Sequence, residues 1–185
     1  MYLEYETDRM ILKILKPSCA EQVLDFYNRD KELFEKYEPD RVDNFYTREY
    51  QQTMLKVEYN LLLKKEVIRF YCFRKEDPNQ IIGTVCFHDI NFFYYKSAEL
   101  GYKFSSQFHH MGYAHEALEK ALEIMFSDLG LHRIEAWVLP ENKPSIHLLE
   151  GLHFTCEGLC KSNLLLHGKW EDHYQFSLIS SLDTQ

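Results

Sequence analysis

The stretch SSQFHHMGYAHEAL, residues 105–118, joins an extended segment to an amphipathic helix through a single glycine, Gly112. The start of such a helix leaves backbone N–H groups without intrahelical partners at the positive end of the helix dipole, so it attracts anions. Gly112 permits close approach of the backbone, and the small Ala114 leaves the first helical turn unobstructed. These features predict an anion cradle for a pyrophosphate on the amides of about residues 111–114. A plain strand-to-helix turn is the alternative.

Histidines and cysteines raise the separate question of a metal site. His109 and His110 are adjacent, so on an extended segment their side chains point to opposite sides and do not converge on one ion. Cys156 and Cys160 are four residues apart, but no second pair stands at the spacing of a zinc site. We therefore expect neither a metal nor a disulfide to be required.

Composition restricts the partners and the compartment. With 185 residues, 45% of them hydrophobic, the chain is long enough for a substantial core, and we expect one domain over 1–185. The net charge of −8 without a basic block argues against nucleic acid, and suits cationic small molecules or basic protein termini. Neither an apolar run of about 20 residues nor a secretory leader is seen, so no membrane partner is expected. Five irregularly spaced cysteines indicate a reducing cytoplasm.

The elements that must position these residues follow from hydrophobic periodicity. The predicted strands are residues 9–15, 67–73, 80–90, 97–104 and 132–138, with two more near 153–160 and 172–179. The predicted helices are residues 18–36 as one helix or two, 47–65, 114–126 and 142–151. Ser18 followed by Glu21 has the pattern of a capping box. Neither GxGxxG nor GxxxxGK[ST] occurs, which argues against a Rossmann dinucleotide site and a Walker-type NTPase.

The predicted helices carry one apolar and one polar face each. The residues of helix 47–65 that are expected to face the core are Tyr50, Met54, Val57, Leu61 and Leu62. The polar face of the helix after Gly112 includes Glu116, and we expect this face to be exposed to solvent without a functional role.

Several segments resemble the GCN5-related N-acetyltransferases, specifically the branch that contains the ribosomal-protein N-terminal alanine acetyltransferases. They are YETDRMILKIL, IIGTVCFHDI, AELGYKF, HHMGYAHEAL, LGLHRIEAWVLPENKPSIHLLE and GKWEDHYQF, and they extend over about residues 9–179. The most specific are AELGYKF with GYAHEAL at a fixed separation, and HRIEAWVLPENKPS. The resemblance implies an α/β (α+β) fold with a central mixed, mostly antiparallel twisted sheet, a splayed strand pair and flanking helices.

The resemblance also implies acetyl-CoA as the cosubstrate, with its pantetheine between the splayed strands. The strand backbone that would bond the pantetheine amides is Leu100, Gly101, Tyr102, Lys103 and Phe104. The segment that would hold the pyrophosphate is His109, His110, Met111, Gly112, Tyr113 and Ala114. Asn142 and Ser145 match an Asn-x-x-Ser pattern near the pantetheine arm and the thioester sulfur. Relatives usually have Lys, Arg or Gln at Met111, and many have a general-acid tyrosine at Leu149.

Acetyl transfer requires a neutral amine and a proton for the leaving thiolate. Glu99, in the central strand, is the first candidate for accepting the amine proton, directly or through water; orienting the amine or pairing with a cation is its alternative role. Glu135 is the second candidate, and it faces either the cleft or solvent. Ser145 either donates a proton to the thiolate or serves ordinary helix N-terminal chemistry.

The sequence therefore predicts an acetyl-CoA-dependent N-acetyltransferase that acts on a primary amine, with a protein N-terminal α-amino group as one candidate. The alternatives are acetylation of a small amine, such as a polyamine, an amino acid or an aminoglycoside, and a catalytically degenerate acyl-CoA-binding module. Residues 37–59 are expected to form one side of the acceptor site. The aromatic run at 91–96 either lines an acceptor groove or contacts a partner, and a homodimer is left open.

Overall fold

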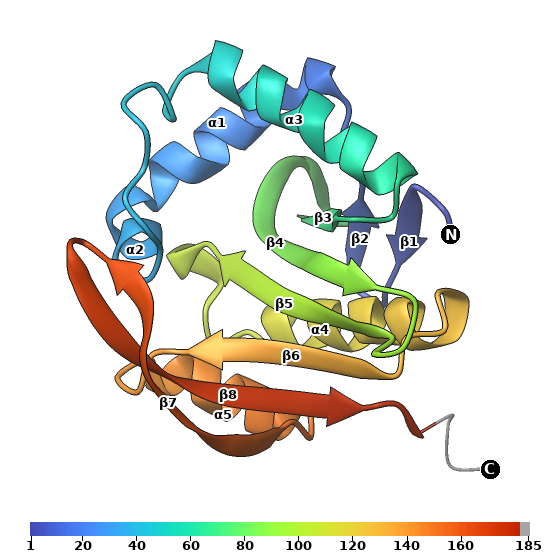
Figure 1. Cartoon of the computed structure of the whole chain (residues 1–185). Helices are drawn as coiled ribbons and strands as arrows, with labels where there is room; N and C mark the ends of the chain where they lie inside the picture. Colours follow the sequence, from blue (N-terminus) through green and yellow to red (C-terminus); the bar gives the residue numbers. More distant parts are fainter. Residues whose placement is uncertain (182–185) are drawn as a thin grey trace.

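The computed structural model describes residues 1–181 and contains one eight-stranded sheet (Figure 1). Its strands are β1 (Glu4–Glu6), β2 (Met10–Lys13), β3 (Ile68–Arg74), β4 (Asp77–Asn91), β5 (Ser97–Phe104), β6 (Arg133–Val138), β7 (Thr155–Leu166) and β8 (Lys169–Ile179). The spatial order is β1-β2-β3-β4-β5-β6-β8-β7. Only the β5–β6 pair is parallel among these neighbours. The predicted mixed, mostly antiparallel sheet is thus confirmed.

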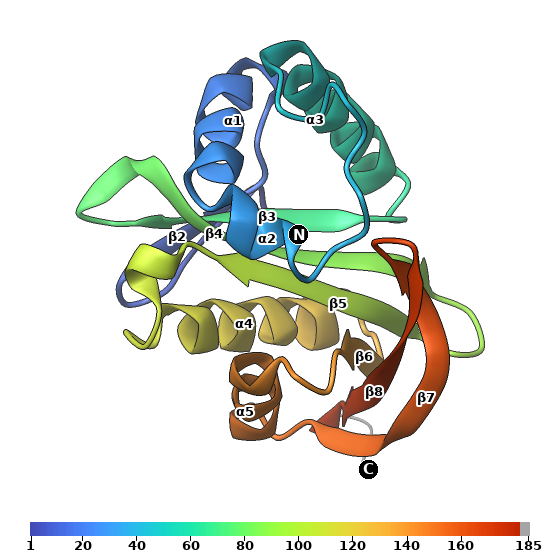
Figure 2. The same cartoon turned by 90° about the vertical axis from the view of Figure 1, so that its left-hand side faces the viewer.

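Helices cover both faces of the sheet. They are α1 (Ala20–Arg29), α2 (Lys31–Glu35), α3 (Arg48–Leu63), α4 (Tyr113–Glu123) and α5 (Lys143–Gly151), with short 3₁₀ helices η1 (Pro17–Cys19) and η2 (Ser106–Phe108) and a π-helix η3 (Ile124–Asp128). Figure 2 shows α1, α2 and α3 over one face and α4 and α5 over the other. Each layer has its own buried apolar cluster against the sheet. No helix within residues 1–181 is long and apolar enough to cross a membrane.

Two local predictions near the N-terminus were wrong. Strand β1 was missed because it has only three residues, EYE, and too few apolar positions for a period to be recognised. The capping box at Ser18 does not form, because Pro17 starts a 3₁₀ turn that contains Ser18. Helix α1 then begins after Cys19 without a side-chain cap.

Helix α3 forms where expected, but it is rotated about its axis. Its buried residues are Gln51, Leu55 and Leu62. Val57, expected in the core, is 40% exposed. The rotation brings Glu58 to the sheet, where its carboxylate accepts hydrogen bonds from Arg69 Nε at 2.7 Å and from the Tyr71 hydroxyl at 3.0 Å. Glu58 lies three residues after Leu55 and four before Leu62, so the ion pair with β3 lies on the same covered face as these two leucines.

The splayed strand pair predicted from the resemblance is present between β5 and β6. Their parallel register ends with Glu99 opposite Glu135. Beyond that point each strand stays paired with its outer neighbour, β5 with β4 as far as Phe104 and β6 with β8 as far as Val138. Because each strand follows a different partner, the two diverge and leave facing backbone edges without a ladder.

Candidate active site

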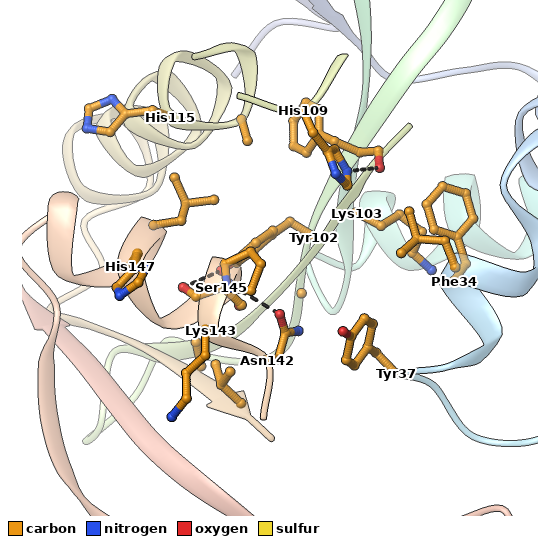
Figure 3. Close-up of a pocket in the computed structure, with 18 of the residues that line it drawn as sticks. Phe34, Tyr37, Tyr102, Lys103, His109, His115, Asn142, Lys143, Ser145 and His147 are labelled. Atoms are coloured by element: carbon orange, nitrogen blue, oxygen red, sulfur yellow. Dashed lines mark hydrogen bonds between the residues drawn. The ribbon is translucent and has the colours of Figure 1, made fainter. Parts of the chain in front are cut away.

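A cleft of about 640 Å³ occupies the space where β5 and β6 separate. Phe34 and Tyr37 line it from the α2 side, and Asn142 and Ser145 line it from α5 on the opposite face of the sheet (Figure 3). Side chains of β5 reach both layers, since Leu100 belongs to the core under α4 and α5 while Lys103 contacts Phe34 of α2. The cleft therefore passes through the sheet and connects its two faces.

The anion cradle lies at one end of this cleft, at the start of α4. Gly112 is the N-cap residue and has φ +80°, in the left-handed region that favours glycine. The backbone N–H groups of residues 111–114 donate no hydrogen bond within the part of the chain that the structure describes. A set of free amides at the positive end of an eleven-residue helix suits a pyrophosphate.

Most of the predicted cofactor-binding residues line the cleft. They are Leu100, Gly101, Tyr102, Lys103, Phe104, His109, His110, Gly112, Ala114, Asn142 and Ser145. Met111 and Tyr113 do not: Met111 is exposed, and the Tyr113 ring lies under the guanidinium of Arg9. His109 turns Nε2 to the Phe104 carbonyl oxygen, 2.9 Å away, and so connects the loop to the end of β5.

Sequence reasoning missed other residues that line the cleft. They include Trp137, two positions after Glu135 in β6, and His115, two positions after Tyr113 in α4. A period-two reading of β6 would have found Trp137, because side chains i and i+2 share a strand face. Of the expected acceptor side at 37–59, only Tyr37 and Glu38 line the cleft, and the aromatic run at 91–96 does not reach it.

Ser145 and Tyr102 meet between α5 and β5. Their hydroxyl oxygens are 2.6 Å apart, and the Asn142 side chain accepts a hydrogen bond from the Ser145 backbone N–H at 3.3 Å (Figure 3). Burial raises the pKa of the Tyr102 phenol well above its ordinary value, so the phenol stays neutral. Leu149, at the position where many relatives have a tyrosine, is wholly buried. A phenol thus approaches Ser145 from β5 instead of from α5.

The α2 side of the cleft is held by charged groups. The Lys103 side-chain nitrogen and the guanidinium of Arg41 both contact the Glu38 carboxylate. Burial, with the nearby Arg69 and Arg41, lowers the pKa of Lys103 well below its usual range. Lys103 is therefore committed to fixing residues 37–41 against β5, and its backbone remains available to the cleft.

The two candidate bases lie next to each other at the point where the strands separate. Glu99 and Glu135 are the last opposed residues of the β5–β6 register, one position before Leu100 and Ala136, and neither lines the cleft. Glu135 already accepts hydrogen bonds from Arg133 and Gln175.

Glu99 has different neighbours. A carboxylate oxygen of Glu99, a carboxylate oxygen of Asp89 and a ring nitrogen of His88 all lie within 4.8 Å of one another. His88 is the cross-strand partner of Glu99. His88 in turn hydrogen-bonds Asp89 at 2.7 Å. Carboxylates and an imidazole therefore gather beside Glu99, a setting that suits a cationic or amine group.

The tip of the β7–β8 hairpin contacts the segment after α2. His167 places Nδ1 2.6 Å from Asp40 and Nε2 2.9 Å from the Glu35 carbonyl oxygen. Figure 2 shows this tip beside the connection from α2 to α3. The hairpin and the α2 segment thus meet over the face of the sheet on which α1 to α3 lie.

Titration of His167 will test this contact. The Asp40 carboxylate and the Glu35 carbonyl raise the pKa of His167 above 6.5, so the charged contact is complete below that pH and is lost as pH rises through the raised pKa. In an NMR titration, Asp40→Asn is expected to return the His167 pKa toward 6.5. An unchanged His167 pKa in Asp40→Asn would show that the contact does not form in solution.

Comparison with known proteins also indicates an acetyltransferase. The model of the acetyltransferase (GNAT) domain matches residues 9–155. The probable N-acetyltransferase YjcK of Bacillus subtilis is 32% identical over 171 residues, covering 92% of this chain and 94% of that protein. The ribosomal protein uS5-alanine N-acetyltransferase of Escherichia coli is 29% identical over 168 residues, covering 90% and 86%.

A solved acetyltransferase structure has the same fold as this chain. The crystal structure of the ribosomal-protein-S5-alanine acetyltransferase of Vibrio fischeri matches with a TM-score of 0.91 and 28% identity, over 97% of this chain and 98% of that one. The free amides before α4 and the unpaired strand edges fit acetyl-CoA, the cosubstrate of this class of enzyme. The resemblance, the acetyltransferase class and the cosubstrate predicted from the sequence are confirmed. The chain belongs to the GNAT acetyltransferases.

Proposed function

We propose that this acetyltransferase acts on the α-amino group at a protein N-terminus. The observation that carries the proposal is the cleft through the sheet, which joins the anion cradle on the α4–α5 side to the opposite face. A cosubstrate bound from one side can meet an acceptor that arrives from the other. The alignment with a ribosomal-protein alanine N-acetyltransferase over 90% of this chain supports a protein acceptor.

The cosubstrate is held by backbone groups more than by side chains. The amides of residues 111–114 receive the pyrophosphate, since no protein acceptor uses them within the described residues. The β5 edge from Leu100 to Phe104, unpaired on the β6 side, bonds the pantetheine amides. Asn142, already the N-cap of α5, lies beside the pantetheine arm.

Proton transfer is assigned to two groups, Glu99 for the amine and Ser145 for the leaving thiolate. An α-amino group has a pKa near 8, so about a tenth of it is neutral at pH 7, and Glu99 accepts the proton that the nitrogen loses, directly or through water. The nitrogen bonds to the thioester carbon and the C–S bond breaks. Ser145 donates a proton to the departing sulfur and regains one from solvent, while the neutral Tyr102 phenol, 2.6 Å away, orients the serine hydroxyl.

An acceptor panel tests the proposed function. Thiol release from acetyl-CoA is measured with a peptide that begins with a free alanine, the same peptide blocked at its N-terminus, spermidine, a free amino acid and an aminoglycoside. We expect turnover only with the free N-terminus, and the acetyl group there by tandem mass spectrometry. Turnover confined to the small amines overturns the proposed acceptor, and CoA binding without any turnover favours a binding module.

Removal of the Ser145 hydroxyl is expected to slow the chemical step. Ser145→Ala deletes a hydrogen bond to a charged leaving group, worth about 1.5 kcal/mol, and kcat should fall about tenfold while KM for acetyl-CoA stays within about twofold. Steady-state kinetics will measure both. Ser18→Ala, at an exposed serine in η1, is the matched control. An unchanged kcat in Ser145→Ala assigns the thiolate proton to another group.

A further inference from the structure

The turn between β1 and β2 is packed against the first turn of α4. The Thr7 hydroxyl donates to Glu116 Oε1 at 2.6 Å, and the Arg9 backbone N–H donates to the same oxygen at 2.9 Å. Arg9 Nε donates to Glu116 Oε2, also at 2.6 Å. The expectation that Glu116 belongs to a solvated face was wrong, because its side chain is only 19% exposed and both oxygens are occupied. Glu116 therefore holds Arg9 in one place.

From that position the Arg9 guanidinium reaches the anion cradle. Its Nη1 donates a hydrogen bond of 2.9 Å to the Met111 carbonyl oxygen, and its plane covers the Tyr113 ring with 4.5 Å between the guanidinium carbon and the ring centroid. Its Nη2 lies 3.3 Å from the point where a Cβ at Gly112 would be. Arg9 thus contacts three consecutive residues at the start of α4.

This hydrogen bond determines where one cradle amide points. The Met111 carbonyl and the Gly112 N–H belong to the same planar trans peptide, so they point in opposite directions. When Arg9 holds the carbonyl, the Gly112 N–H is directed to the other side. Gly112 lines the cleft, and within the described residues its N–H has no protein acceptor.

We infer that Arg9 is a positioning residue for acetyl-CoA. It fixes the peptide between Met111 and Gly112 with the N–H toward the cleft, and it brings a permanent positive charge behind a loop in which Met111 supplies none. The inference rests on the proposed use of residues 111–114 as the pyrophosphate site. Glu116 serves the same function indirectly, by orienting the guanidinium through a charge-assisted hydrogen bond.

A ligand pair that differs in the pyrophosphate separates this role from a general structural one. CoA carries the pyrophosphate together with a 3′-phosphoadenosine, and pantetheine carries neither, so titration calorimetry of both gives a ratio of Kd values for that end of the cosubstrate. We expect Arg9→Ala to weaken CoA binding about fivefold and to leave pantetheine binding within about 1.5-fold. In kinetics KM for acetyl-CoA should rise by a similar factor while kcat stays within about twofold.

Further variants keep the test decisive. Arg9→Lys retains the charge but loses the planar fork, so an intermediate CoA affinity is expected. Glu116→Gln keeps the shape of the side chain and weakens its hold on Arg9, so it should give a smaller loss for CoA alone. Arg48→Ala is the matched control, because Arg48 pairs with Glu21 at 3.3 Å and is 51% exposed, against 47% for Arg9.

The outcomes distinguish Arg9 from the cradle itself. Equal losses for CoA and pantetheine in Arg9→Ala, or no loss for either, overturn the positioning role while the wild type still prefers CoA. A wild type that binds CoA no better than pantetheine overturns the pyrophosphate site, and the role of Arg9 with it. A selective loss for CoA in both Arg9→Ala and Glu116→Gln supports the inference.

Discussion

Replacing Gly112 by aspartate is expected to weaken CoA binding by more than about tenfold. Two like unit charges 4 Å apart repel by about 4 kcal/mol at an effective dielectric constant of 20, whereas a tenfold loss needs only about 1.4 kcal/mol. The new Cβ would also lie 3.3 Å from Arg9 Nη2, so the added side chain would disturb the guanidinium that holds the Met111 carbonyl. Titration calorimetry with CoA is the measurement.

Strain must be separated from charge in that experiment. Gly130→Asp is the matched control, since Gly130 has φ +68° and nothing lies within 4 Å of its added Cβ, so it carries the same backbone cost away from the cleft. Gly112→Ala keeps the strain at φ +80° without the charge, and a smaller loss of affinity is expected. A folded Gly112→Asp variant with unchanged CoA affinity would remove the pyrophosphate site from the loop.

Glu99→Gln is expected to lower kcat by about 100-fold, at the lower end of general acid–base contributions. Glu99 does not line the cleft, and cofactor affinity should therefore be retained. The loss should shrink as pH rises, because more of the α-amine is neutral without assistance. The measurement is a pH–rate profile with the acceptor identified by the panel.

Glu135→Gln is the matched comparison, because Glu135 stands directly opposite Glu99 in the register. Its carboxylate already accepts hydrogen bonds from Arg133 and Gln175, so replacing it should lower kcat less than replacing Glu99 does. A rise in KM with kcat unchanged would assign amine positioning to Glu99 instead. Equal kcat and identical pH–rate profiles for wild type and Glu99→Gln would contradict the catalytic role.

Local patterns in the sequence were sufficient for most elements. Strands β3, β4 and β5 were recognised from alternation and from β-branched and aromatic residues, since a strand exposes alternate residues to its two faces. The start of α4 after Gly112 was recognised from the apolar periodicity that begins at Ala114. The family followed from motifs at fixed separations, and the match over residues 9–155 confirms it.

Contacts between distant segments were decided only by the tertiary structure. Glu58 of α3 meets Arg69 of β3, and the environment of Ser145 depends on Tyr102, which is 43 residues away. Arg9 and Met111 are 102 residues apart, so no local pattern links them.

The same division applies to the cleft itself. AELGYKF and HRIEAWV were each recognisable as strands, but their separation after Glu99 and Glu135 follows from which outer neighbour each one keeps. Periodicity reports which residues share a face of one element. The relative placement of two elements is set by packing and hydrogen bonds across the whole sheet, and these have no local signature in the chain.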